Sequence, residues 1–185
     1  MKKNAKYLVG GLVGVAVVVA AYFGASGGMF QGKIDLNTNV TRAELMKLFT
    51  VPVVEKSGEN MSQYTCAPFS DVKATDWAAP YVCYMYKHGV VKGYADGTFG
   101  PDKSVTRAEA AKMVDVLMGL PVLNSPKGAP YTDVPATHWF SNWDDAFANY
   151  GIGDIKGWVG AKFYPDQALT KGRAQYWANN LAKVL

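Results

Sequence analysis

Three cations occupy one equivalent position in three similar stretches of this 185-residue chain. They are Arg42, Arg107 and Lys171, and each directly follows a threonine that is expected to cap a helix. A positive charge is unfavourable at a helix N-terminus, which indicates another purpose. The arginine fork suits a carboxylate on an acidic sugar, whereas a lysine offers only a point charge. The structural alternative is an ion pair to Asp71, to Asp133 or to a neighbouring stretch.

Aromatic residues form the second candidate set for binding, because their flat faces suit the apolar faces of sugar rings. Trp77 and Trp139 precede expected helices, and Tyr94 and Trp158 lie in expected loops. Large aromatic side chains also dominate small cores, so packing is the alternative. We favour packing for the first pair and leave both roles open for the second.

No residue pattern in the sequence supports catalysis or a metal site. His88 and His138 lie in different stretches, and the HExxH, GxSxG and CxxC motifs do not occur. The Asp96-Gly97 pair lacks the alternating oxygen ligands of a calcium loop, so we expect a turn there. We therefore expect a binding protein without a cofactor rather than an enzyme.

These candidates are arranged by an internal repeat. Phe69-Ser70-Asp71-Val72 recurs as Tyr131-Thr132-Asp133-Val134, and Gly93-Tyr94 recurs as Gly157-Trp158. A third, partial copy lies upstream, where residues 39–44 match residues 104–109. The upstream copy keeps the end of its loop and its second helix, but its aromatic first half is missing. Repeats of this length form one supersecondary unit each.

Each repeat is expected to fold as helix, loop, helix. Thr106 and Glu109 form a capping box at the start of a second helix, as do Thr41 and Glu44. Apolar residues then follow at helical spacing and predict a core-facing stripe. The third copy has Arg173 where the others have glutamate, which predicts a weaker cap.

The first helix of the second repeat is expected from about Pro80 to His88, and its counterpart in the third repeat spans about 140–150. We expect Asp71 and Asp133 to have a structural role, capping the turn into these helices. Gly89 would end the first of them. The fold class is therefore all-α.

The N-terminus is typical of a targeting segment. Lys2, Lys3 and Lys6 precede 19 uncharged residues from Tyr7 to Ala25. This apolar run is longer than a usual cleaved signal and just long enough for a membrane helix, so both interpretations stay open. Without those lysines the net charge of +4 falls to about +1, so charge gives no support for a nucleic-acid partner.

Cys66 and Cys83 are the two cysteines of the chain. Export would place them in an oxidising environment, where a disulfide between them is favoured over two buried thiols.

Taken together, the ordered motifs of residues 69–118 resemble an S-layer homology repeat. The resemblance is carried by Phe69-x-Asp71-Val72, by Trp77, by residues 93–101 and by Val105-Thr106-Arg107-Ala108-Glu109. Residues 131–185 resemble a degenerate copy, and residues 32–49 resemble a partial one. Segments 50–68 and 119–130 are expected to be linkers between them. Residues 1–28 would then be the signal peptide or membrane anchor, and 29–185 the S-layer homology domain.

The resemblance implies a pseudo-threefold bundle with grooves between the copies, which binds cell-wall polysaccharide and fixes the protein at the cell surface. Arg107, Tyr94 and Asp96-Gly97 are the expected lining of the strongest groove. The alternative is a membrane-anchored interaction or S-layer assembly module. In that case residues 7–25 would hold the membrane and the incomplete first repeat would allow self-association.

Overall fold

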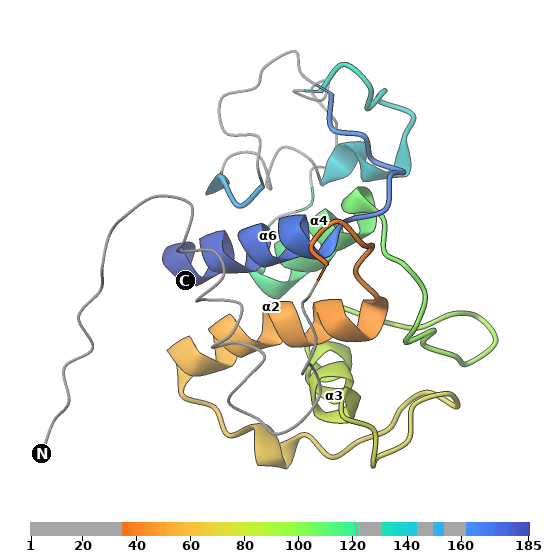
Figure 1. Cartoon of the computed structure of the whole chain (residues 1–185), viewed down its shortest axis with the longest axis vertical. Helices are drawn as coiled ribbons and strands as arrows, with labels where there is room; N and C mark the ends of the chain where they lie inside the picture. The colour runs from red at the N-terminus through yellow and green to blue at the C-terminus, as the bar shows by residue number, and fades with distance from the viewer. Residues whose placement is uncertain (1–34, 121, 123–130, 144–149, 154–161) are drawn as a thin grey trace, which may run out of the picture. The chain divides into compact units, whose positions relative to one another are not determined.

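The described part of the chain is helical. The computed structural model describes residues 35–120, 122, 131–143, 150–153 and 162–185 (Figure 1). Its α-helices are α2 (Arg42–Ser57), α3 (Ala79–Lys87), α4 (Arg107–Leu117) and α6 (Lys171–Val184). Two short 3₁₀ helices, η1 (Met61–Gln63) and η2 (Trp139–Asn142), complete the set, and these residues include no strand. The all-α prediction is thus confirmed, while the predicted N-terminal helix lies outside the described residues.

The predicted capping boxes begin α2 and α4. At α4, the Glu109 backbone N–H donates to Thr106 Oγ1 at 3.2 Å, and the Thr106 N–H donates to Glu109 Oε2 at 2.9 Å. Thr41 and Glu44 repeat both hydrogen bonds at α2. Each box satisfies two backbone donors that a helix N-terminus leaves unpaired.

The second helices bury the apolar stripes that the sequence predicted. Leu45 and Phe49 of α2, Val114 of α4, and Trp177 and Leu181 of α6 are all fully buried. In Figure 1, α2 lies between α6 and α3, and it packs against both.

The helix α2 is longer than expected. It continues past residue 49 to Ser57, with Pro52 inside it, and ends at Gly58, whose φ is +73°. The Gly58 N–H donates to the Val54 carbonyl at 2.8 Å, which closes the last turn. The linker expected at 50–68 therefore starts only at Gly58, because the helix continues through Pro52 for about two more turns.

The first helices match the prediction in the second repeat. Ala79–Lys87 agrees within one residue with the expected range, and Gly89 follows it in the left-handed region with a φ of +71°. In the third repeat, η2 marks the start of the expected helix at 140–150. Residues 144–149 lie outside the described set.

Backbone hydrogen bonds join the three repeats in a closed ring. The N–H groups at the start of each second helix donate to carbonyls in the loop of another repeat. These bonds are Arg42 to Lys103, Ala43 to Pro101, Arg107 to Gln167, Ala108 to Pro165, Lys171 to Thr38 and Gly172 to Leu36, with N···O distances of 2.8–3.0 Å. Helix N-terminal donors that the caps leave unpaired thereby hold the repeats together.

The predicted disulfide between Cys66 and Cys83 is confirmed. The two Cα atoms are 5.3 Å apart and the two sulfur atoms are bonded. Beside it, the buried Tyr64 ring packs against the Tyr84 ring at 4.9 Å between centroids. The disulfide and this aromatic contact hold the linker after α2 against α3.

Candidate functional site

A groove of about 470 Å³ lies where residues from all three repeats meet. Arg42 comes from the first repeat and Trp139 from the third, while the second repeat supplies the α3–loop junction and one side of α4. Its lining residues are Arg42, Gly89, Val90, Val91, Lys92, Gly93, Glu109, Lys112, Met113, Val116, Trp139 and Trp143. We call it the Lys112 groove.

Cations and aromatic rings share the walls of this groove. The Lys112 Nζ atom lies 5.8 Å from the ring centroid of Trp139 and 5.2 Å from that of Trp143. Arg42 and Lys92 add positive charge. Glu109, the acidic side chain among the described lining residues, already accepts a hydrogen bond from the backbone N–H of the capping threonine. Such walls suit a ligand with an apolar ring face and a negative group.

Glycine shapes the loop side of the groove. Gly93 has a φ of +74°, and a Cβ atom there would lie 2.3 Å from the Phe69 ring and 2.7 Å from the Thr98 carbonyl oxygen. No other residue fits this position. Glycine therefore lets the loop pass directly against the Phe69 ring and the Thr98 carbonyl.

Arg42 both faces the groove and supports the fold. Its Nε atom donates to the Phe99 carbonyl at 2.9 Å, and its guanidinium carbon lies 4.7 Å from the Phe99 ring centroid. The Tyr94 ring is 5.2 Å away on another side. Lys103 Nζ also lies over the Tyr94 ring, at 3.9 Å. Tyr94 thus orders the cations beside the groove and is itself absent from its lining.

Arg107 has a different environment from the one expected. Its Nε atom donates to the Phe163 carbonyl at 2.6 Å, and the guanidinium lies over the rings of Phe163 and Trp177. It is 5% exposed. Burial, followed by the positive charge of Arg173, lowers its pKa to about 10.

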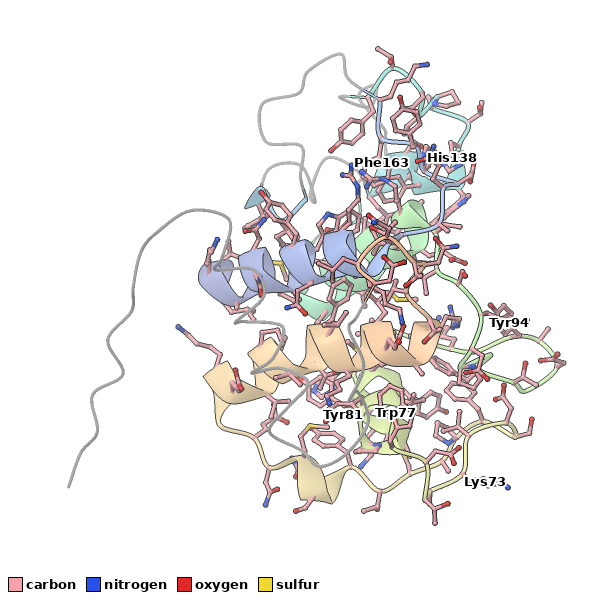
Figure 2. The ribbon with its side chains drawn as sticks, viewed as in Figure 1. Lys73, Trp77, Tyr81, Tyr94, His138 and Phe163 are labelled. Atoms are coloured by element: carbon pink, nitrogen blue, oxygen red, sulfur yellow. A yellow bond between two sulfur atoms is a disulfide. The ribbon has the colours of Figure 1, made fainter. Side chains whose placement is uncertain are left out.

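The expected grouping of Arg107 with Tyr94 and the Asp96-Gly97 turn is therefore wrong. Tyr94 contacts Arg42 instead, and Figure 2 places Tyr94 well away from Phe163, the partner of Arg107. Sequence equivalence showed that the two arginines share a position, but it could not show that each faces the following repeat.

Replacing Arg107 with lysine is expected to lower the free energy of unfolding by about 1 kcal/mol, because lysine cannot both stack on the rings and keep the bond to the Phe163 carbonyl. Chemical denaturation of the variant and the wild-type chain measures the difference. Binding at the Lys112 groove should persist in the folded variant, and weakened binding at unchanged stability would contradict this assignment.

Lys171, the third equivalent cation, pairs with an acid of the first repeat. Its Nζ atom lies 2.7 Å from Glu44 Oε1, in a partly buried position. For this position the sequence left open a sugar-binding role or an ion pair to a neighbouring repeat, and the structure shows the ion pair.

Asp71 and Asp133 have the expected structural role with different partners. The Asp71 carboxylate accepts from the Phe99 and Gly100 N–H groups at 2.7 and 2.8 Å. Asp133 accepts from Phe163 and Tyr164 at the same two distances. They fix the far end of the loop, and the α3 N-cap, Ala78, has no side-chain cap.

The Asp96-Gly97 turn is present. Asp96 Oδ1 accepts from the Thr98 hydroxyl at 2.6 Å and from the Thr98 N–H at 3.0 Å, and these bonds lower the Asp96 pKa. This exposed turn is outside the Lys112 groove. Trp77 lies before α3 and is 38% exposed, while Trp158 is outside the described residues.

Lys92, Lys112 and Trp143 are groove residues that the sequence interpretation missed. Lys112 lies in a helix for which the sequence predicted only the core-facing apolar stripe. Trp143 lies within an expected helix and was given no role. A usable pattern exists, because Lys112 corresponds to Lys47 and Trp143 to Tyr81 in the repeat alignment. The alignment therefore repeats a cation and an aromatic ring together.

Replacing Arg173 with glutamate is expected to raise the free energy of unfolding by about 1 kcal/mol. Thr170 Oγ1 accepts from the Arg173 N–H at 3.4 Å, but an arginine cannot return the second bond of a capping box. Glutamate would complete the box and would replace the positive charge beside Arg107 with a negative one. Thermal and urea denaturation test this, and a loss of stability would show that Arg173 has a favourable partner of its own.

The described residues contain no cluster of three histidine, cysteine or acidic side chains placed to hold a metal ion. They also contain no helix with the length and apolar character needed to span a membrane.

Comparison with known proteins identifies the repeat. The S-layer homology domain model matches residues 68–111. The endoglucanase of Bacillus sp. (strain KSM-635) is 34% identical over 69% of this chain, and the cellulosome-anchoring protein of Acetivibrio thermocellus is 30% identical over 82%. S-layer protein EA1 of Bacillus anthracis is 33% identical over 56%.

This chain spans only part of those relatives, namely 13% of the endoglucanase, 33% of the anchoring protein and 12% of EA1. The similarity therefore concerns one module that proteins of different overall function share. Residues 68–111 of this chain are an S-layer homology domain, and its relatives include S-layer and cellulosome-anchoring proteins.

Proposed function

We propose that this protein binds cell-wall polysaccharide without catalysis and is thereby held at the outer surface of the cell. The Lys112 groove is the observation that carries this proposal. It combines two tryptophan faces with Arg42, Lys92 and Lys112, and an acidic sugar needs both features. The names of the S-layer and cellulosome-anchoring relatives support a surface location.

The ring of interrepeat hydrogen bonds supports a pseudo-threefold arrangement of the repeats. Each second helix begins against the loop of another copy, so each interface is built from equivalent residues. The three interfaces nevertheless differ in charge. Arg42 faces the Lys112 groove, Arg107 lies near Arg173, and Lys171 is paired with Glu44. We infer that these differences make the first interface the principal glycan site.

The endoglucanase relative does not argue for catalysis in this chain. The match covers 13% of that enzyme, and the region shared with S-layer proteins is the S-layer homology module. Glycoside hydrolysis requires two placed carboxylates. Among the described residues that line the Lys112 groove, Glu109 is the only acid, and it takes part in a helix capping box.

Co-sedimentation with purified wall sacculi tests the proposal. We expect the full chain to sediment with intact sacculi and to remain in solution once their secondary polymers have been chemically stripped. Equal binding to stripped sacculi would show that the ligand is the peptidoglycan itself. The absence of binding to both would refute wall binding and favour the membrane-anchored interaction or S-layer assembly role.

A further inference from the structure

His138 stands directly before Trp139, which lines the Lys112 groove. It is the N-cap of η2, and its Nδ1 atom accepts a hydrogen bond from the Phe140 N–H at 3.2 Å. The side chain is 18% exposed, and its ring lies beside that of Trp139 with 5.8 Å between the centroids. His138 therefore supports a residue of the groove wall, although it is not itself part of the lining.

The short helix η2 is held to the core by Phe140. This residue is fully buried and stacks on Phe163, with 4.9 Å between the ring centroids. Figure 2 shows His138 where η2 meets the loop that carries Phe163. Trp139 lies between the two ends of the capping bond, so the bond fixes the backbone from which its indole reaches the groove.

The capping bond requires one protonation state of His138. A backbone N–H can only donate, so the Nδ1 atom must be the unprotonated nitrogen of a neutral ring. His88, the other histidine of the chain, has the opposite requirement. Its Nδ1 atom lies 2.9 Å from the Tyr84 carbonyl oxygen and must carry a hydrogen to bond it. Protonation is therefore compatible with the hydrogen bond of His88 and incompatible with that of His138.

Charged side chains reach this unit from two other elements. The Asp166 Oδ1 atom, from the loop before α6, lies 3.6 Å from His138 Nε2. Asp166 is 82% exposed, so solvent screens its attraction for a protonated ring. Lys112 of α4 lies 5.8 Å from the Trp139 ring centroid. A movement of Trp139 therefore also separates Lys112 from one of its aromatic partners.

We propose that His138 is a positioning residue that makes glycan binding at the Lys112 groove dependent on pH. This inference rests on the proposed function, because the quantity that responds is the affinity for the wall polymer. At neutral pH the unprotonated ring caps η2 and holds Trp139 in the groove wall. Imidazole side chains take up a proton within about pH 5–8, and a proton on Nδ1 would face the Phe140 N–H. The cap is then lost, Trp139 leaves the wall, and the protein binds the polymer more weakly under acidic conditions.

Co-sedimentation of the full chain with wall sacculi at about pH 7.5 and about pH 5.5 tests this dependence. We expect the affinity to fall about fivefold at the lower pH, which corresponds to the loss of one helix-capping bond. His138→Asn keeps an acceptor oxygen near the position of Nδ1 but does not titrate. Its affinity should match that of the wild type at the higher pH and stay unchanged at the lower pH. His88→Asn is the matched control and should keep the wild-type pH dependence.

NMR of the ¹⁵N-labelled full chain without ligand measures the first step separately. Long-range ¹H–¹⁵N spectra report which nitrogen of each imidazole ring carries the hydrogen. At about pH 7.5 we expect a hydrogen on Nε2 of His138 and on Nδ1 of His88. The Trp139 indole resonance should shift between the two pH values in the wild type and stay in place in His138→Asn.

Four results would overturn the inference. Equal wild-type binding at both pH values would remove the pH dependence and leave the proposed function intact. A fall in affinity that persists in His138→Asn would place the titrating group elsewhere. A hydrogen on Nδ1 of His138 at the higher pH would exclude the capping bond without any variant. If the chain bound sacculi at neither pH, the proposed function and this inference would both be refuted.

Discussion

Reduction of the Cys66–Cys83 disulfide should lower the free energy of unfolding by about 3 kcal/mol. The bond closes a loop with a sequence separation of 17, and in the chain-entropy model a loop of this size restricts the unfolded chain by about that amount. It also holds Tyr64 against Tyr84. Urea denaturation of the oxidised and reduced chain measures the effect, and the Cys66→Ala, Cys83→Ala double variant is the control.

The double variant should have the stability of the reduced wild-type chain and should not respond to reductant. Equal stability of the oxidised and reduced wild-type chains would contradict the prediction, because it would mean that the crosslink itself does not stabilise the fold.

Replacement of Asp71 with asparagine is expected to cost about 2 kcal/mol near pH 7. The carboxylate accepts two backbone hydrogen bonds, from Phe99 and Gly100, whereas an asparagine offers one acceptor oxygen and turns an amide donor toward the second N–H. One backbone donor would then lose its partner. Denaturation near neutral pH measures the loss, and Asp133→Asn is the matched test in the third repeat.

The Asp71 effect should depend on pH. Burial raises the pKa of this carboxyl, but the Phe99 and Gly100 N–H groups outweigh it, and the net pKa lies below the ordinary value of 3.8. A lowered pKa in the folded state means that the stabilisation is present above about pH 4 and is lost as the pH falls through the folded-state pKa. The difference between wild type and Asp71→Asn should therefore shrink near pH 3, and a difference that grew there would contradict the assignment.

Local sequence rules predicted the helices well because the relevant interactions are short in range. The Thr106–Glu109 capping box and the glycine after α3 act within a few residues, so their types and spacing were sufficient. The repeat alignment ended the first copy at residue 49, so the continuation of α2 to Ser57 was not predicted. Pro52 is a local helix breaker, but its burial shows that packing outweighs that preference here.

The candidate site was harder to predict because its residues come from three repeats. The repeat alignment placed Arg42, Arg107 and Lys171 at one equivalent position. The contacts of each side chain, however, come from the neighbouring repeat. Arg107 lies over Phe163 and Trp177, and Lys171 meets Glu44. Lys112 acquires its role only when Trp139 and Trp143 are brought beside it, and no pattern within α4 indicates that contact.

The affinity of the Lys112→Gln chain for wall sacculi is the sharpest test of glycan binding at the Lys112 groove. Lys112 is half-buried, contacts Trp139 and Trp143, and has no part in the capping boxes, so its replacement should leave the melting temperature close to that of the wild type. We expect binding to weaken about tenfold, through the loss of a charge-assisted hydrogen bond. Wild-type affinity in a correctly folded Lys112→Gln chain would contradict the assignment of this groove as the glycan site.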